Sequence, residues 1–200
     1  MNRFAALLDR LSYEPRRNAK IALIAGYFRE TPDPARGLAL AALTGDLDFR
    51  HAKPGVIRTL IEELTDPVLF RMSYDYVGDL SETVALLWPV NTVANDNSRD
   101  IALPDVVAAL KAAGKAELPA LLAGVLDNLD ETGRWAFLKL ITGGLRVGVS
   151  ARLAKTAVAA LGELQPRDVE EVWHGLEPPY EALFAWAEGR AGKPANSNPA

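Results

Sequence analysis

The sequence lacks the residues from which disulfides and most metal sites are built. It contains no cysteine and only two histidines, His51 and His174, which lie far apart in the chain. A disulfide and a thiolate metal site are therefore excluded, and a histidine-rich metal site is disfavoured. No stretch approaches the roughly 18 apolar residues that span a bilayer. These absences predict a soluble cytoplasmic protein with no metal site and no membrane contact.

The motifs of several large enzyme classes are missing as well. The sequence has no phosphate loop ending in Gly-Lys-Ser/Thr, no glycine fingerprint for a dinucleotide after a strand, and no Gly-x-Ser-x-Gly. We therefore assign no catalytic residue to this chain.

Apolar residues recur with the period of a helix along almost the whole chain. The segment "RFAALLDRL" places its apolar side chains at i, i+3, i+4 and i+7, and similar patterns follow. Residues typical of helix ends stand between them. We expect Gly45 to end one helix, Asp66 to cap the helix that Pro67 opens, and either Asp79 or Ser81 to cap the next.

Two segments depart from this pattern. Residues 89–103 are polar and asparagine-rich and indicate an exposed connection. Residues 189–200 are small and polar, which indicates a linker or a disordered tail. No segment has the pattern of a strand. We therefore expect an all-α fold, a single domain of about ten to twelve short helices over residues 1–188.

The net charge of −4 is unevenly distributed. No Asp or Glu occurs from residue 134 to 162, whereas the following stretch is acidic. The basic residues of the first stretch are Arg134, Lys139, Arg146, Arg152 and Lys155. Salt screens charges beyond about 8–10 Å, so a local basic surface can bind phosphate on an acidic protein. Solvated helix faces of opposite sign would give the same pattern, and charge alone leaves both interpretations open.

The segment "TGGLRVGVS", residues 142–150, favours phosphate binding. Gly143, Gly144 and Gly148 let backbone approach an anion, and the N–H groups of a helix N-terminus attract one. Arg146 would pair with a phosphate oxygen, and Ser150 would cap the following helix. Lys139, Arg152 and Lys155 would extend the contact surface from the flanking helices. The alternative is a plain interhelical turn, for which one glycine would suffice.

Two weaker candidates lie earlier in the chain. In "EPRRNAKI", Arg16, Arg17 and Lys20 cluster at a helix start, where positive charge opposes the macrodipole unless an anion binds. In "DYVGDLSETVALLW", Gly78 breaks a helix and exposes backbone donors. At Gly78 an ordinary turn explains the sequence at least as well as contact with DNA.

Three segments, "FAALLDRLSYEPRRNAKIALIAGYF", "SYDYVGDLSETVALLWP" and "FLKLITGGLRVGVSARLAKTAVA", resemble the N-terminal DNA-binding domain of bacterial-type ATP-dependent DNA ligases. The resemblance covers residues 2–188, and "LITGGLRVGVS" is its most specific part. It implies an all-helical domain that grips the minor groove and phosphates of nicked duplex DNA in repair, replication and recombination. In that family the glycine-arginine loop contacts DNA, which implies this role for Gly143, Gly144, Arg146 and Gly148. The resemblance also implies DNA contacts for Arg16, Arg17, Lys20 and Gly78.

The chemistry of that family resides in a separate nucleotidyltransferase domain, which forms a lysyl-adenylate in a Lys-x-Asp-Gly motif. No lysine of this sequence is followed by x-Asp-Gly. The tail lies where that domain would begin, so we expect a non-catalytic, monomeric DNA-binding part. The resemblance implies ATP and Mg²⁺ for a full-length ligase and no cofactor for this chain, which would act at the nucleoid.

Two other functions remain open. A helical protein–protein adaptor is compatible with the net negative charge and the acidic C-terminal quarter. A helix-hairpin-helix DNA glycosylase would use Asp168, about twenty residues after the glycine segment, as its carboxylate. Asp168 follows "QPR" in a context typical of a helix cap, and the Leu-Pro-Gly expected at such a hairpin is absent.

Overall fold

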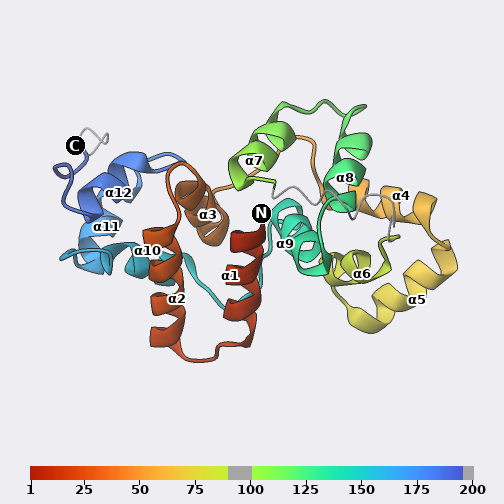
Figure 1. Ribbon diagram of the computed structural model, residues 1–200, viewed down its shortest axis with the longest axis horizontal. Coiled ribbons are helices and arrows are strands. Elements are labelled where there is room, and N and C mark those ends of the chain that lie inside the picture. Colours follow the sequence, from red (N-terminus) through yellow and green to blue (C-terminus); the bar gives the residue numbers. More distant parts are fainter. Residues whose placement is uncertain (90–100, 196–200) are drawn as a thin grey trace. The chain divides into compact units, whose positions relative to one another are not determined.

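A computed structural model of the protein describes residues 1–89 and 101–195 (Figure 1). These residues form twelve α-helices and no strand, so the prediction of an all-α fold with ten to twelve helices is confirmed. The chain divides into two compact units, which we describe separately. Unit 1 comprises Met1–Ala6 and Asp48–Leu145, and unit 2 comprises Leu7–Leu47 and the residues from Arg146 onward.

Unit 1 is built around the pairing of α6 with α9 and of α4 with α5 and α8. Phe70 and Phe137 are fully buried in it. The buried Arg134 donates from Nε to the carbonyl oxygen of Leu126 at 2.8 Å. The helices are α4 (Pro54–Leu64), α5 (Pro67–Val77), α6 (Leu80–Leu87), α7 (Leu103–Ala112), α8 (Leu118–Asp127) and α9 (Glu131–Thr142).

Unit 2 has α10 at its centre, in contact with four other helices of the unit. Its buried face consists largely of alanines, which permit close helix packing. Phe28 and Phe184 pack edge to face, with ring centroids 5.1 Å apart. The helices are the later part of α1 (Asn2–Tyr13), α2 (Arg17–Glu30), α3 (Ala35–Thr44), α10 (Ala151–Ala159), α11 (Pro166–Trp173) and α12 (Glu181–Ala187).

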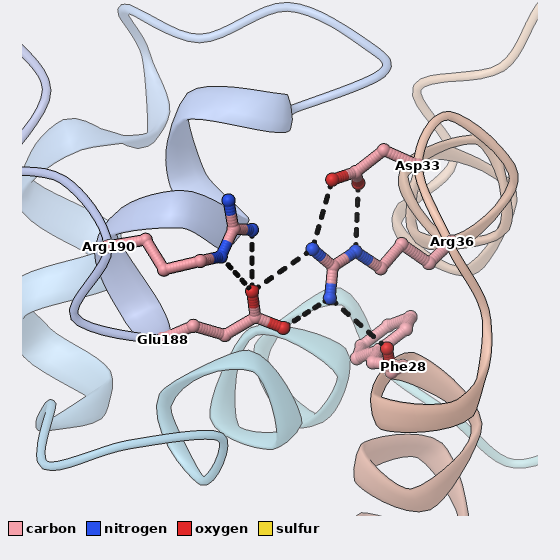
Figure 2. Close-up of polar contacts among 5 residues, drawn as sticks. All are labelled: Phe28, Asp33, Arg36, Glu188 and Arg190. Carbon is pink, nitrogen blue, oxygen red and sulfur yellow. Dashed lines mark hydrogen bonds and ion pairs between the residues drawn. The ribbon is translucent and has the colours of Figure 1, made fainter.

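A buried arginine ties the end of α12 to the turn between α2 and α3 (Figure 2). Arg36 donates to both carboxylate oxygens of Asp33, at 2.8 and 3.0 Å, and to the carboxylate of Glu188. Its Nη1 also donates to the carbonyl oxygen of Phe28 at 3.2 Å. The bonds from Arg36 and Arg190 hold the pKa of the Glu188 carboxyl below its ordinary value, despite partial burial. Charged partners thus satisfy the buried guanidinium, as burial of a charge requires.

The predicted helix ends are partly correct. Asp66 caps α5 ahead of Pro67, accepting from the N–H of Val68 at 2.7 Å, and Gly45 ends α3 with a φ of 83°. Of the two residues expected to cap α6, Asp79 is the capping residue, because its carboxylate accepts from the N–H of Glu82 at 3.0 Å.

The two segments predicted to be irregular lie partly outside the described residues. Residues 90–100, most of the predicted connection, and residues 196–200 of the predicted tail lie outside the described residues. The tail begins with residues that bond back to unit 2: Lys193 Nζ donates to Glu171 Oε2 at 2.7 Å. Among the described helices, none is long and apolar enough to span a membrane.

Candidate phosphate-binding loop

The segment between α9 and α10 has an unusual backbone. Three residues adopt left-handed conformations: Gly143 with a φ of 73°, Arg146 with a φ of 51° and Gly148 with a φ of 65°. A non-glycine residue in this region is uncommon and marks a conformation that its surroundings must enforce. Val147 is buried, whereas the Arg146 side chain is exposed to solvent. The local fold thus anchors the loop through Val147 and presents Arg146.

The first glycine of the segment has a structural explanation. Gly143 is the C-cap of α9, and its N–H donates to the carbonyl oxygen of Lys139 at 3.2 Å. A Cβ at this position would meet no other atom, so only the positive φ requires glycine. Gly78 caps α5 in the same way, with a φ of 75°. The N–H groups of Gly143 and Gly78 both donate to carbonyl oxygens of the helices that they end. Gly144, the next residue after Gly143, is a half-buried loop residue.

Lys20 has a different place from the one predicted. Its side chain is buried, and Nζ donates to the carbonyl oxygens of Val147 at 2.6 Å and Gly148 at 3.0 Å. A Cβ on Gly148 would lie 2.4 Å from this Nζ. Gly148 therefore serves two needs, a positive φ and the close approach of the ammonium. Lys20 fixes the loop through its backbone carbonyls. The sequence did not predict this role, because Lys20 and Val147 lie 127 positions apart.

The loop leads directly into the N-terminus of α10. Ser150 caps this helix, its hydroxyl accepting from the N–H of Leu153 at 3.2 Å, as predicted. Arg152 lies in the first turn and is exposed. Within the described part of the chain, neither Arg146 nor Arg152 has a hydrogen-bond or ion-pair partner for its guanidinium. Two unpaired cations therefore flank a helix end that carries partial positive charge.

The two flanking lysines were expected at the surface, and this expectation is wrong. Lys139 is buried and donates to Asp79 Oδ2 at 2.7 Å. Lys155 is buried and donates to Glu170 Oε2 at 2.8 Å, with its ammonium 4.3 Å from the ring centroid of Trp173. The basic stretch has no acid of its own, but acids from other helices neutralise these two residues.

Desolvation raises the pKa of the Asp79 carboxyl, but its hydrogen bonds outweigh this effect. The bond from Lys139 and those from backbone N–H groups leave the pKa below its ordinary value. Asp79 is therefore a carboxylate at neutral pH. It acts both as the cap of α6 and as the counterion of a buried lysine.

The basic cluster at the start of α2 is also partly neutralised. Arg16 donates from Nε to Glu14 Oε1 at 2.9 Å, and its backbone N–H donates to the same oxygen. These bonds lower the pKa of the half-buried Glu14 carboxyl to about 2, so the pair is fully charged at neutral pH. Arg17, the first residue of α2, is exposed. Of the three basic residues predicted here, Arg17 alone is both exposed and without a carboxylate partner among the described residues.

Other chemistry-bearing groups have structural partners. Asp168 accepts from the N–H of Gln165 at 2.7 Å and completes a capping box at the start of α11. In the described ranges no three His, Asp or Glu side chains form a group that could hold a metal ion. No family model matches the sequence, and no curated protein matches it.

Proposed function

We propose that the protein binds the phosphate backbone of duplex or nicked DNA through the loop Arg146–Ser150, as the DNA-binding part of an ATP-dependent DNA ligase. One observation carries this proposal. Two exposed, unpaired arginines, Arg146 and Arg152, flank a helix N-terminus whose loop is fixed by the buried Lys20. A cation held in a left-handed conformation is a strained arrangement, which a binding role would explain.

The geometry supports recognition of phosphate without recognition of sequence. Backbone N–H groups and guanidinium groups bind phosphate oxygens, which are identical along any duplex. The exposed Arg17 is a further contact candidate, whereas Lys20, Lys139 and Lys155 act inside the protein and the N–H of Gly78 is used within its helix. In a full-length ligase, ATP and Mg²⁺ would serve the nucleotidyltransferase domain, and this chain would act as a monomer at the nucleoid in repair, replication and recombination.

Binding of fluorescein-labelled nicked and intact duplexes as a function of salt tests this proposal. Each neutralised phosphate contributes a slope of about −0.9 in log K against log salt. We expect a slope of about −2 to −3 for the few contacts of this loop, little dependence on sequence, and no release of bases from damaged duplexes. A slope near zero, or binding only to a protein partner, would overturn the proposal. Base release that Asp168→Asn abolishes would favour a glycosylase instead.

A further inference from the structure

Most residues of helix α5 in unit 1 are exposed among the described residues. Only one of its eleven residues, Phe70, is buried. Val68 is 56%, Leu69 52%, Met72 67% and Tyr76 93% exposed. A surface helix normally has polar residues on its solvent side, so four large apolar side chains there require an explanation.

These exposed side chains lie on one face of the helix. Val68, Met72 and Tyr76 are spaced at i, i+4 and i+8, and Leu69 lies beside them. Phe70, about half a turn away from Met72, anchors the opposite face, where α5 packs against α4 and α6. The helix is therefore apolar on both sides. We call the outward stripe Val68, Leu69, Met72 and Tyr76 the α5 face.

The charges of α5 and of the two helices that pack against it, α4 and α6, are mostly acidic. From Pro54 to Trp88 the sequence has six acidic residues and two arginines. Arg58 is bonded to α5, with Nη2 donating to the Tyr74 hydroxyl at 2.9 Å. Arg71 donates from Nε to the carbonyl oxygen of Pro67 at 3.2 Å. The exposed acids of this region are Glu62, Glu63, Asp66, Asp75 and Glu82.

This charge pattern selects among the partners of an apolar helix face. DNA and anionic lipid surfaces attract Lys and Arg and are repelled by an acidic surround. A second copy of the chain would bring two acidic surfaces together, which opposes association. A helix of another protein that has apolar side chains on one face and Lys or Arg beside them is complementary to the apolar α5 face and to the acidic residues of this region.

We propose that the α5 face is a docking site for a basic amphipathic helix of a partner protein, seated against Val68, Leu69, Met72 and Tyr76. The exposed acidic residues of α4, α5 and α6 orient the partner through its basic flanks. This site lies in unit 1, whereas Arg146 and Arg152, for which phosphate contacts are proposed, lie in unit 2.

The test uses a labelled 18-residue Leu/Lys peptide with leucines at helical spacing, and a Leu/Glu peptide with the same leucines. We expect the Leu/Lys peptide to bind at least about tenfold more tightly, because the exposed charges of α4, α5 and α6 are mostly acidic. Met72→Glu adds a negative charge to the α5 face. If charge attraction alone held the Leu/Lys peptide, this variant would bind it more tightly; if the apolar contact with Met72 holds it, the variant binds it more weakly. We expect about a tenfold weakening, as for an anchor residue.

Tyr13→Glu is the matched control, since Tyr13 is 82% exposed but lies at the end of α1, outside the α5 face. This variant should bind the Leu/Lys peptide as the parent does, and thermal unfolding should report that both variants fold. Binding that is unchanged or stronger in Met72→Glu overturns the proposal. Equal affinity for the two peptides also overturns it. Concentration-dependent dimerisation abolished by Met72→Glu would assign the face to a second copy instead.

Discussion

The ammonium of Lys20 lies 2.6 Å from the carbonyl oxygen of Val147 and is buried beneath the loop that presents Arg146. The ammonium gains dipole interactions with these carbonyls, and its charge also attracts the Glu14 carboxylate. Such an arrangement fixes backbone strongly, because the carbonyls cannot rotate away without leaving the charge unsatisfied. The shape of the loop therefore depends on α2 as well as on its own glycines.

Lys20→Met should separate a positioning role from direct phosphate contact. Loss of two charge-assisted bonds should lower the free energy of unfolding by about 2 kcal/mol. It should also loosen the loop and weaken DNA binding about tenfold, a loss of 1.4 kcal/mol. Because the buried ammonium contributes no phosphate contact, the salt slope should stay that of the parent. Urea unfolding and salt-dependent DNA titration check this. Unchanged stability, together with a salt slope whose magnitude falls by about one, would instead show that Lys20 contacts a phosphate.

The two left-handed glycines of the loop should differ in their tolerance of alanine. Gly143→Ala introduces only the cost of a positive φ, about 1–2 kcal/mol, because the space around it is empty. Gly148→Ala adds a Cβ 2.4 Å from Lys20 Nζ and must also displace that ammonium. We expect Gly148→Ala to be the more destabilising in urea unfolding.

A double-mutant cycle tests the cause of that difference. In Lys20→Met the alanine at 148 no longer meets an ammonium pinned by two carbonyls, so the two substitutions should be non-additive by about 1 kcal/mol. Strict additivity would mean that Gly148 and Lys20 act independently.

The Asp79–Lys139 pair should make the stability of the protein depend on pH in the acid range. Asp79 has a lowered pKa in the folded protein. Its contribution is therefore complete above the unfolded pKa of about 3.9 and is lost as pH falls through the lower folded value. Asp79→Asn should cost about 3 kcal/mol at pH 7, because Lys139 stays buried without a counterion.

Urea unfolding across pH checks this prediction. The parent should lose more stability than Asp79→Asn as pH falls through about 4 and below. Asp75→Asn, which removes an exposed charge on α5, should follow the parent curve. Parallel curves for the parent and Asp79→Asn would show that Asp79 contributes nothing to the acid dependence.

The sequence predicts features that depend on neighbouring residues. Asp66 before Pro67 and Ser150 before α10 were identified correctly as caps, because capping joins groups within three positions. The left-handed Gly143 also follows from the end of an apolar helical run. The periodicity of the whole chain predicts the all-α class, since burial of a helical stripe is a local pattern.

Features that depend on distant partners were not predicted. Lys139 bonds to Asp79 across 60 positions and Lys155 bonds to Glu170 across 15, so the absence of acids from residues 134–162 does not reveal that these lysines are paired. The sequence alone does not reveal whether a charged side chain is buried or exposed. Only the fold distinguishes Arg146 and Arg152 at the surface from the lysines beside them.

The salt dependence of DNA binding by Arg146→Ala tests the central claim most directly. Arg167→Ala is the control, because it removes the same charge from an 83% exposed arginine on α11. We expect Arg146→Ala to weaken binding about tenfold at low salt on any DNA sequence and to reduce the magnitude of the salt slope by about one. Arg167→Ala should leave both values close to those of the parent. If Arg146→Ala folds normally and matches Arg167→Ala in affinity and slope, the loop is an interhelical turn and the proposed phosphate contact is wrong.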